Sequence, residues 1–405
     1  MEATATLLRQ PCAAPVVADH RRSRLRDSLG RFFAALLIAL LSPSGIADGD
    51  LVFSPAPTMG EPGARQLLDL ERAGERLVAV GASGLVVLSD DGGDSWRQVE
   101  VPVSATLTAV HFPSAQRGWA VGHAGVIIAS EDGGETWALQ FDGRRANDAL
   151  LVWARQQREG LEEKLSDAEE AGADAAEIDD LAYLLEEAVY LEEDAQLAVD
   201  TGPADPFLGV YFLDEQRGMA VGAYGMAYRT ENGGQDWRIH IAGIDNLDRF
   251  HLYALAQDAG GALYLSGEAG LLYRSTDEGL TFDRFFDVYD GSLFGLLPFG
   301  EGMLVYGLRG NLFATDATGS GWQHLESGNR NSLYGGTRLD NGDLLLVGAG
   351  GRILSLASGG RAQLLQHPSR STFSSALQGP DGRIWLVGMD GLARFDEAVA
   401  VGEND

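Results

Sequence analysis

Cysteine and lysine are almost absent from this sequence, and each occurs once among 405 residues. The cysteine, Cys12, lies in a segment that we expect to be removed on export. The mature chain would then form no disulfide and offer no thiolate for catalysis or for a zinc site. We interpret the single lysine, Lys164, as a matter of genomic composition rather than of mechanism. Long apolar runs are also missing, because the run Phe32–Leu41 has ten residues whereas a membrane-spanning helix needs about 20.

The first 47 residues have the pattern of an export signal. Basic residues between Arg21 and Arg31 precede the apolar run, and the small-residue stretch Gly45-Ile46-Ala47 follows it. We predict cleavage after Ala47, with an uncleaved anchor as the alternative. No cysteine follows the apolar run, so nothing in the sequence indicates a lipoprotein. The predicted location is the periplasm, or a compartment like the thylakoid lumen if the host is phototrophic.

The chain is strongly acidic, with a formal net charge of -29. Residues 1–47 contain six arginines and three acidic residues, so their removal changes the charge to -32. Phosphate backbones and anionic lipid surfaces would repel such a protein. We therefore expect no nucleic-acid partner and at most a peripheral association with membranes.

A repeat with a period near 40 residues runs through the rest of the chain. Its clearest copies are "LVAVGASGLVVLSDDGGDSW", "GWAVGHAGVIIASEDGGETW" and "GMAVGAYGMAYRTENGGQDW". The shared G-x-x-G motifs start at Gly81, Gly122, Gly222, Gly267, Gly307, Gly348 and Gly388, with steps of 41, 100, 45, 40, 41 and 40 residues. Several short strands in each unit of this length predict propeller blades rather than a helical solenoid. The fold class predicted for residues 48–405 is thus an all-β, seven-bladed β-propeller.

The last copy stops after "GLARFDEA" and lacks an outer strand. We predict that residues 51–56, "LVFSPA", supply this strand, which would close the ring and leave no open sheet edge.

The step of 100 residues comes from an insertion at residues 144–205. Ile178, Leu181, Leu185 and Ala188 follow the spacing of one helix face, and "AGAD" separates two helical stretches. These features predict a helical hairpin. Between Ala146 and Asp205 there are 18 acidic and 3 basic residues. Two interpretations stay open: the charge keeps an exposed hairpin soluble, or the hairpin binds a partner.

A second motif, S-x-D-x-G-x-x-W, lies between the third and fourth strands of four repeats. A hydroxyl and a short acid can accept hydrogen bonds from backbone N–H groups of a turn, glycine permits a positive φ, and the aromatic ring packs between blades. Asparagine serves the turn as well as aspartate, which a catalytic acid would not allow. We interpret these positions as structural: Ser89, Asp91, Gly93 and Trp96; Ser130, Asp132, Gly134 and Trp137; Thr230, Asn232, Gly234 and Trp237; Ser275, Asp277, Gly279 and Phe282.

This motif resembles the Asp-box, or BNR repeat, of sialidases and other propellers. The combination with A-V-G-x-x-G and with the segments Gln116–Gly122 and Gln216–Gly222 resembles the photosystem II stability/assembly factor family, over about residues 65–395. The resemblance implies an exported seven-bladed propeller that binds membrane-protein assembly intermediates and is not an enzyme. The long acidic hairpin departs from the compact pattern of that family.

In a four-stranded blade, the G-x-x-G turns and the hairpin share one face, and the S-x-D-x-G-x-x-W turns lie on the opposite rim. The turn residues on the first face, including Ser83, are therefore the candidates for function. The predicted partner-binding residues are His123, Tyr224, Glu268, Arg309 and Asp390. The expected partner is an envelope or membrane protein, either a complex or a transporter, and the expected state is a monomer.

The alternative function is an Asp-box glycoside hydrolase similar to sialidases, with Glu268 or Asp390 as the essential acid. No R-I-P sequence begins the chain, and Arg117 and Arg217 recur with the repeat instead of forming a separate triad. No H-E-x-x-H motif or paired histidines are present, so we expect no metal and no cofactor.

Overall fold

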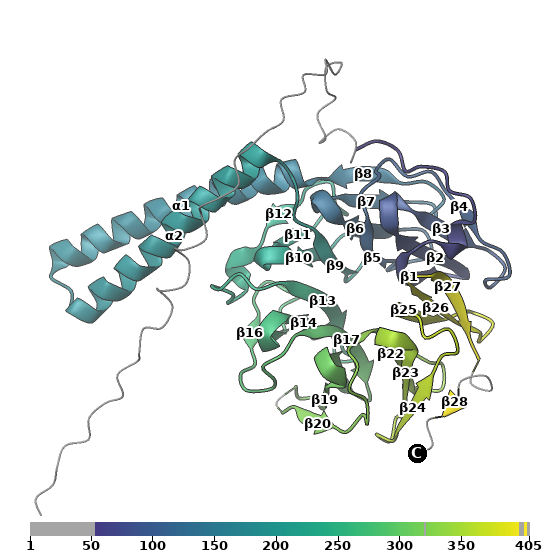
Figure 1. The fold of residues 1–405 in the computed structure, drawn as a ribbon. Helices are drawn as coiled ribbons and strands as arrows, with labels where there is room; N and C mark the ends of the chain where they lie inside the picture. The colour runs from purple at the N-terminus through teal and green to yellow at the C-terminus, as the bar shows by residue number, and fades with distance from the viewer. Residues whose placement is uncertain (1–52, 320, 397–400, 403–405) are drawn as a thin grey trace, which may run out of the picture. The chain divides into compact units, whose positions relative to one another are not determined.

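A computed structural model describes residues 53–319, 321–396 and 401–402 of the chain. The predicted export signal and its cleavage site after Ala47 lie outside these residues. In the described part, the strands form seven antiparallel sheets (Figure 1). Each is built from strands that follow one another in the chain, except that the C-terminal strand β28 is added to the sixth sheet. Five of these sheets have four strands, one has five and one has three. The fold of the described residues is mostly β-structure of the propeller type, with two α-helices.

We number the sheets in chain order, and their strands have the following bounds. The first contains β1 Leu67–Ala73, β2 Arg76–Gly81, β3 Val86–Ser89 and β4 Arg97–Gln98; the second, β5 Leu107–His111, β6 Gly118–Gly122, β7 Ile127–Ser130 and β8 Ala138–Phe141; the third, β9 Phe207–Phe212, β10 Gly218–Gly222, β11 Ala227–Thr230 and β12 Arg238–Ile239. The fourth contains β13 Leu252–Gln257, β14 Leu263–Gly267, β15 Leu272–Ser275 and β16 Asp283–Arg284; the fifth, β17 Leu293–Phe299, β18 Gly302–Gly307, β19 Leu312–Ala314 and β20 Gln323–Leu325. The sixth contains β21 Leu333–Arg338, β22 Leu344–Gly348, β23 Arg352–Leu356, β24 Ala362–Gln366 and β28 Val401–Gly402; the seventh, β25 Phe373–Gln378, β26 Ile384–Gly388 and β27 Gly391–Phe395.

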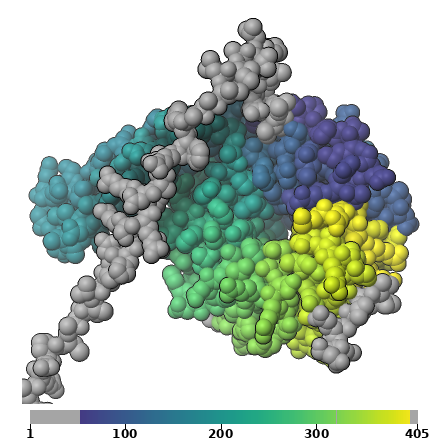
Figure 2. All heavy atoms as spheres, in the orientation of Figure 1, coloured from purple at the N-terminus to yellow at the C-terminus, as the bar shows by residue number. Residues whose placement is uncertain are grey.

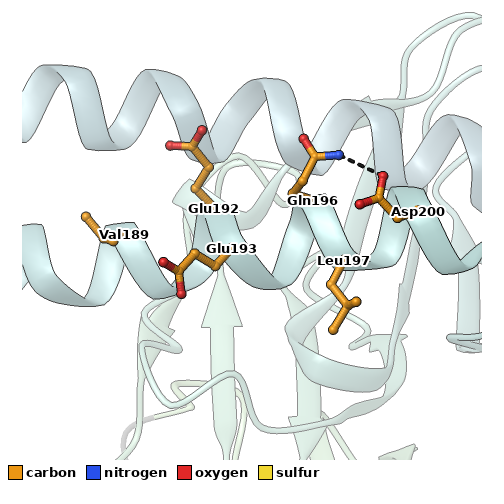
Figure 3. A pocket seen from close by; sticks show the side chains of 6 residues that line it. All are labelled: Val189, Glu192, Glu193, Gln196, Leu197 and Asp200. Carbon is orange, nitrogen blue, oxygen red and sulfur yellow. Dashed lines mark hydrogen bonds between the residues drawn. The ribbon is translucent and has the colours of Figure 1, made fainter.

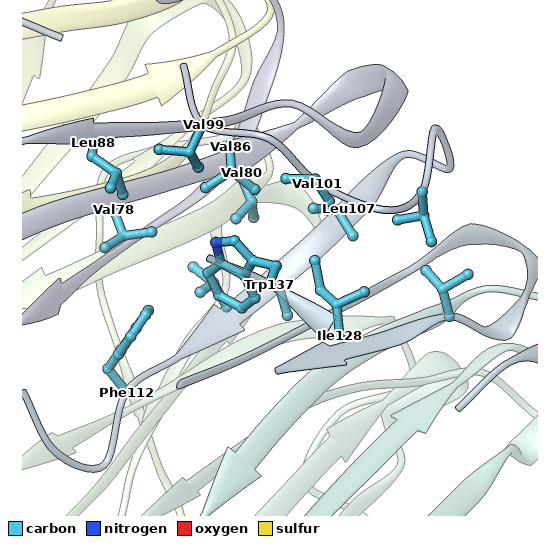
Figure 4. Packing of buried hydrophobic residues seen from close by; sticks show 14 of the residues in the cluster. Val78, Val80, Val86, Leu88, Val99, Val101, Leu107, Phe112, Ile128 and Trp137 are labelled. Carbon is cyan, nitrogen blue, oxygen red and sulfur yellow. The ribbon is translucent and has the colours of Figure 1, made fainter. Parts of the chain in front are cut away.

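The first strand of each sheet contacts the first strand of the next sheet, and β25 of the seventh sheet contacts β1, so the sheets close a ring. The core lies between neighbouring sheets, where apolar side chains are removed from water. Trp137 is a clear example, because it packs among first-sheet residues that include Val78 and Leu88 (Figure 4). Its ring also meets Phe112 edge to face at 5.9 Å. The motif tryptophan of the second sheet thus fills the junction with the first.

The prediction that residues 51–56 complete the last sheet is wrong for the described residues 53–56. These residues form no strand, and the seventh sheet has three strands in the described part of the chain. The Ala56 N–H instead donates to the Val101 carbonyl oxygen at 2.9 Å, beside the first sheet. Pro55 and Pro57 have no N–H group, so every second donor that a strand would offer is missing here. The C-terminal strand β28 pairs with β24 of the sixth sheet and also leaves the seventh sheet unextended.

Arg383, which precedes β26, and Trp385 on β26 join the seventh sheet to the first. The Trp385 Nε1–H donates to the Gly92 carbonyl oxygen at 2.9 Å, and Arg383 donates to the Asp91 carbonyl oxygen at 3.1 Å. Arg383 also pairs with Asp94. The Trp385 and Trp96 rings meet edge to face at 5.8 Å. The junction that lacks a shared strand is therefore held by contacts on the "SDDGGDSW" turn.

The insertion contains two antiparallel helices, α1 Gly143–Ala171 and α2 Ala175–Thr201. Asp142 and Asp174 cap their N-termini by accepting backbone N–H groups, and Gly172 ends α1 in the left-handed conformation. Leu151, Ala154 and Ala195 form a small buried core between the helices. The surface of the hairpin extends beyond the body formed by the sheets (Figure 2).

Candidate functional site

The S-x-D-x-G-x-x-W turns use their acids for internal hydrogen bonds. The Ser89 hydroxyl donates to Asp91 Oδ1 at 2.8 Å, and the Gly93 N–H donates to the Ser89 oxygen at 2.7 Å. Ser95 donates its N–H to Asp91 Oδ1 and its hydroxyl to Oδ2. The Ser95 hydroxyl is the main cause that lowers the pKa of Asp91 to about 2. Such a carboxylate is a poor general acid or base near neutral pH.

The same arrangement recurs at the corresponding residues of the second, third and fourth sheets. In the third sheet Asn232 Oδ1 takes the place of the carboxylate oxygen and accepts the Asp236 N–H at 3.0 Å. A charge is therefore not required for this turn. In the fifth sheet Ala317 replaces the acid, and the buried Thr315 hydroxyl has no hydrogen-bond partner among the described residues.

Each of four turns is also held by a side chain of the preceding sheet. Arg76 donates to the Gly133 carbonyl oxygen and Gln140 to that of Gly233, both at 3.0 Å. His240 Nε2 lies 2.8 Å from the Gly279 carbonyl oxygen. Trp385, described above, makes the equivalent contact across the seventh and first sheets. We call these four contacts the inter-sheet clasps. They indicate that the turns at this rim stabilise the ring.

The first six G-x-x-G turns have a different conformation, with a residue in the left-handed region before the last glycine. Ser83, Tyr224 and Arg309 adopt φ values of 57°, 52° and 58°. Non-glycine residues in this region carry strain of about 1 kcal/mol or more. A Cβ on the following Gly84 would lie 2.0 Å from the Val103 oxygen, so glycine is required there. At the strained position the side chains of Tyr224 and Arg309 are exposed, Ser83 is half-buried and Ala124 is buried.

The hairpin emerges beside these turns. A Cβ on Gly125, in the second G-x-x-G turn, would lie 2.6 Å from the Gly143 Cα at the start of α1. The Tyr228 hydroxyl donates to the Ala146 carbonyl oxygen at 2.8 Å, and Arg249 pairs with Asp194 of α2 at 3.1 Å. The base of the hairpin is thus fixed against the second and third sheets and the loop before the fourth.

Of the predicted partner-binding residues, the structure brings Tyr224 and Glu268 together through His251. The Tyr224 N–H donates to His251 Nδ1 at 2.9 Å, and the His251 N–H donates to Glu268 Oε2 at 3.2 Å. Tyr224 keeps 53% of its surface exposed. His123, Arg309 and Asp390 are exposed as well, but no side-chain hydrogen bond or ion pair within the described residues joins them to this group.

Three aromatic residues that sequence reasoning missed extend this group along the inner strands. Tyr253, Phe294 and Tyr334 each follow the first leucine of an inner strand, where the pairing with the second strand shifts register. Such bulges redirect a side chain. The recurring triplets "HLY", "SLF" and "SLY" at residues 251, 292 and 332 are the available signal, but they look like ordinary strand sequence.

The aromatic rings form a continuous series from one sheet to the next. The ring centroids of Tyr224 and His251 lie 4.9 Å apart, and those of His251 and Tyr253 lie 6.4 Å apart. Phe294 then lies 5.3 Å from Tyr253 and 5.4 Å from Tyr334. We call these five residues the aromatic arc. It follows the inner circumference of the ring from the third to the sixth sheet, at the end of the inner strands next to the G-x-x-G turns.

Titratable side chains on β1 and β5 line a different part of the inner circumference. Burial raises the pKa of Asp69, and it raises the pKa of Glu71 to about 7. Asp69 Oδ2 accepts the Val110 N–H at 2.9 Å, which joins the first two sheets. Burial lowers the pKa of His111 to about 4, and its Nδ1 accepts the Phe212 N–H. Asp69 and His111 connect neighbouring inner strands. Sequence reasoning did not single out any of these three residues.

A family model described as the photosynthesis system II assembly factor YCF48 matches residues 88–149. The photosystem II assembly lipoprotein Ycf48 of Synechococcus sp. (strain CC9902) is 25% identical over 202 residues, which cover 47% of this chain. The match spans 58% of that relative. This chain resembles the photosystem II assembly factor family. The resemblance predicted from the repeats is confirmed.

Solved structures of YCF48 share the fold. The structure described as YCF48 bound to D1 peptide has a TM-score of 0.54 at 15% identity and covers 84% of this chain and 99% of its own. YCF48 from Cyanidioschyzon merolae has a TM-score of 0.55 at 15% identity, with 85% and 98% covered. At this level of identity, these structures show that the chain shares their fold.

The geometry offers little to the hydrolase alternative. Glu268 and Asp390 lie on turns of the fourth and seventh sheets, and within the described residues no hydrogen bond connects their side chains. In the same residues, no three His, Cys, Asp or Glu side chains gather as a metal site would require. None of the described helices combines the length and the apolar composition needed to cross a bilayer.

Proposed function

We propose that this chain is an exported, non-catalytic seven-bladed propeller with Asp-box turns that assists the assembly of a membrane-protein complex. In this proposal residues 48–405 form the propeller in the periplasm or a lumen-like compartment, and residues 144–205 form a hairpin inserted in it. The protein acts as a monomer and holds an extended segment of a membrane-protein subunit. The resemblance to photosystem II assembly factors supports the role.

The aromatic arc is the observation that carries the proposed binding site. Aromatic residues that are partly exposed provide large contact areas at small entropic cost, and they dominate the energetics of many interfaces. Tyr224 and Tyr334 have 53% and 38% of their surface exposed. An extended peptide could lie along the arc and place apolar side chains between successive rings. Arg309, on the G-x-x-G turn of the fifth sheet, would provide a cation for a peptide carboxylate.

The test is capture of detergent-solubilised membrane proteins from the host by tagged mature chain, followed by binding assays with synthetic peptides from the captured subunit. Tyr334→Ala should weaken peptide binding about tenfold or more, and so should the combined replacement of Tyr253 and Phe294 by alanine. Leu280→Ala is the matched control, because Leu280 is 48% exposed on the turn between β15 and β16, at the opposite rim. Reversal of charge by Arg309→Glu should also weaken binding.

Unfolding midpoints for each variant separate lost binding from lost folding. Equal capture by wild type and by the folded arc variants would reject the arc as the binding site. Turnover of a sialoside that Glu268→Gln or Asp390→Asn abolishes would instead establish the hydrolase alternative.

A further inference from the structure

The outer face of α2 carries a line of exposed large apolar side chains. Tyr183, Tyr190 and Leu197 are 60%, 55% and 60% exposed. Their spacing is seven residues, so they lie on one face of the helix with a drift of about 20° per step. At 1.5 Å per residue the line is about 21 Å long. We call these three residues the α2 stripe.

The stripe is separate from the face of α2 that packs on α1. Ala188 and Ala195 are the buried residues of α2, and Leu191 and Val199 pack around the core between the two helices. Figure 3 shows Glu192 directed toward α1 and Leu197 directed away from it. A shallow groove next to the stripe is lined by Val189, Glu192, Glu193, Gln196, Leu197 and Asp200. Helix α2 therefore has a second apolar face, on which the three side chains of the α2 stripe are mostly exposed.

Acidic side chains flank the stripe along its whole length. Helix α2 contains nine acidic residues and no basic residue. Arg155 and Arg158 of α1 neutralise Glu192, and Arg249 pairs with Asp194. Glu187 and Glu193 have no ion pair among the described residues. Glu186 accepts the Tyr190 hydroxyl at 3.2 Å, and this contact together with the field of neighbouring glutamates raises the pKa of Tyr190.

We propose that the α2 stripe is a docking surface for a basic amphipathic helix of a partner protein. Apolar residues with a heptad spacing are recognised by a helix that presents matching apolar positions. The flanking carboxylates select arginine or lysine beside those positions and speed the encounter. A second copy of this hairpin would bring two faces without basic residues together, and an anionic membrane would be repelled. The inference does not depend on peptide binding at the aromatic arc.

The first experiment uses the mature full chain and a designed 21-residue peptide with leucine at heptad positions a and d and arginine at e and g. A peptide of identical composition in scrambled order is the control probe. Fluorescence anisotropy should give a dissociation constant at least about tenfold lower for the patterned peptide, and the affinity should fall as salt rises. Equal affinity for the two peptides would show that charge attraction alone accounts for the binding, and this result would overturn the proposal.

Variants then locate the binding surface. Replacing Tyr183, Tyr190 and Leu197 by serine should weaken the affinity for the patterned peptide by about tenfold or more. The control is Val152→Ser on α1, which should leave this affinity unchanged although Val152 is 55% exposed. Glu187→Gln with Glu193→Gln should reduce the salt dependence. Circular dichroism confirms that the hairpin stays helical in each variant.

The same experiments distinguish two other ligands for the α2 stripe, namely a second copy of the chain and a lipid surface. Sedimentation velocity that shows a dimer lost in the serine variant would assign the stripe to self-association and overturn the proposal. Binding to anionic vesicles that the serine variant abolishes would assign it to a lipid surface, with the same consequence. Unchanged patterned-peptide binding in the serine variant would also refute it. Because none of these variants touches the aromatic arc, loss of arc-dependent capture would count against the proposed function alone.

Discussion

Replacing Trp385 with alanine should open the junction between the seventh and first sheets before any other junction of the ring. The substitution removes the hydrogen bond to the Gly92 carbonyl oxygen, worth about 1 kcal/mol, and the edge-to-face contact with Trp96, worth about another 1 kcal/mol. Loss of the half-buried ring surface adds about 1 kcal/mol or more. The total of about 3 kcal/mol corresponds to a rise of about 100-fold in local opening. No shared strand compensates for this loss at the junction.

Hydrogen exchange measured by mass spectrometry reports such opening region by region. Trp385→Ala should accelerate exchange in β25–β27 and in β1–β4, while the third to fifth sheets keep their protection. Trp385→Phe keeps an aromatic ring but removes the donor and part of the ring surface, and it should give a smaller effect of about fivefold or somewhat more. Trp137→Ala is the control for position, because it should loosen the junction of the first and second sheets instead. Uniform acceleration in all seven sheets, or unchanged exchange in β25–β27, would refute this account of the closure.

Three further predictions concern single side chains. Burial raises the pKa of Glu71 to about 7, so its contribution to stability is complete below about pH 4.5 and is lost as the pH rises through 7. Glu71→Gln should therefore stabilise the protein at pH 8 by up to about 3 kcal/mol and have little effect at pH 4. Urea unfolding at the two pH values measures the difference. Ala317→Asp should give the unpartnered Thr315 hydroxyl an acceptor and raise the free energy of unfolding by about 1 kcal/mol, as measured by urea unfolding. No gain would mean that the turn cannot adopt the geometry of its counterparts. Because Asp91 has its pKa lowered to about 2, its stabilisation is present above about pH 4 and is lost as the pH falls toward 2; Asp91→Asn, which imitates Asn232, should reduce this acid sensitivity in thermal melts, and an unchanged acid profile would contradict that assignment.

The repeat pattern was sufficient to predict the sheets and the helical pair, because glycines and turn residues impose local conformations that can be read without tertiary contacts. Residues 53–56 show where this reasoning ends. A short apolar segment with two nearby prolines has no local signal for the sheet it will contact, and contacts with residues 99–103 determine its position. The role of Trp385 in joining the seventh sheet to the first could not be predicted for the same reason, because its partner Gly92 lies almost 300 positions away in the sequence.

The candidate site was predictable in part. The G-x-x-G turns indicated the face on which we propose that binding occurs, and Tyr224 and Glu268 are linked there through His251. The link between them is His251, and Tyr253, Phe294 and Tyr334 extend the site because a bulge redirects each of them. A bulge depends on the pairing of two strands, so the same triplet in sequence could equally have been an ordinary buried position.

The hairpin leaves and re-enters the ring at nearly one point. A Cβ on Gly143 would approach the Pro203 Cβ to 2.6 Å, so the two ends of the insertion adjoin. The inter-sheet clasps lie on the opposite rim and do not involve these ends. An exchange of the inserted element between Asp142 and Pro203 would therefore leave the inter-sheet clasps in place, although it would remove the contacts of Ala146 and Asp194 with the sheets and the loop before the fourth sheet. The ring of sheets can therefore act as a constant scaffold with one insertion site. Different inserted elements at this site would bind different partners while the scaffold stays the same.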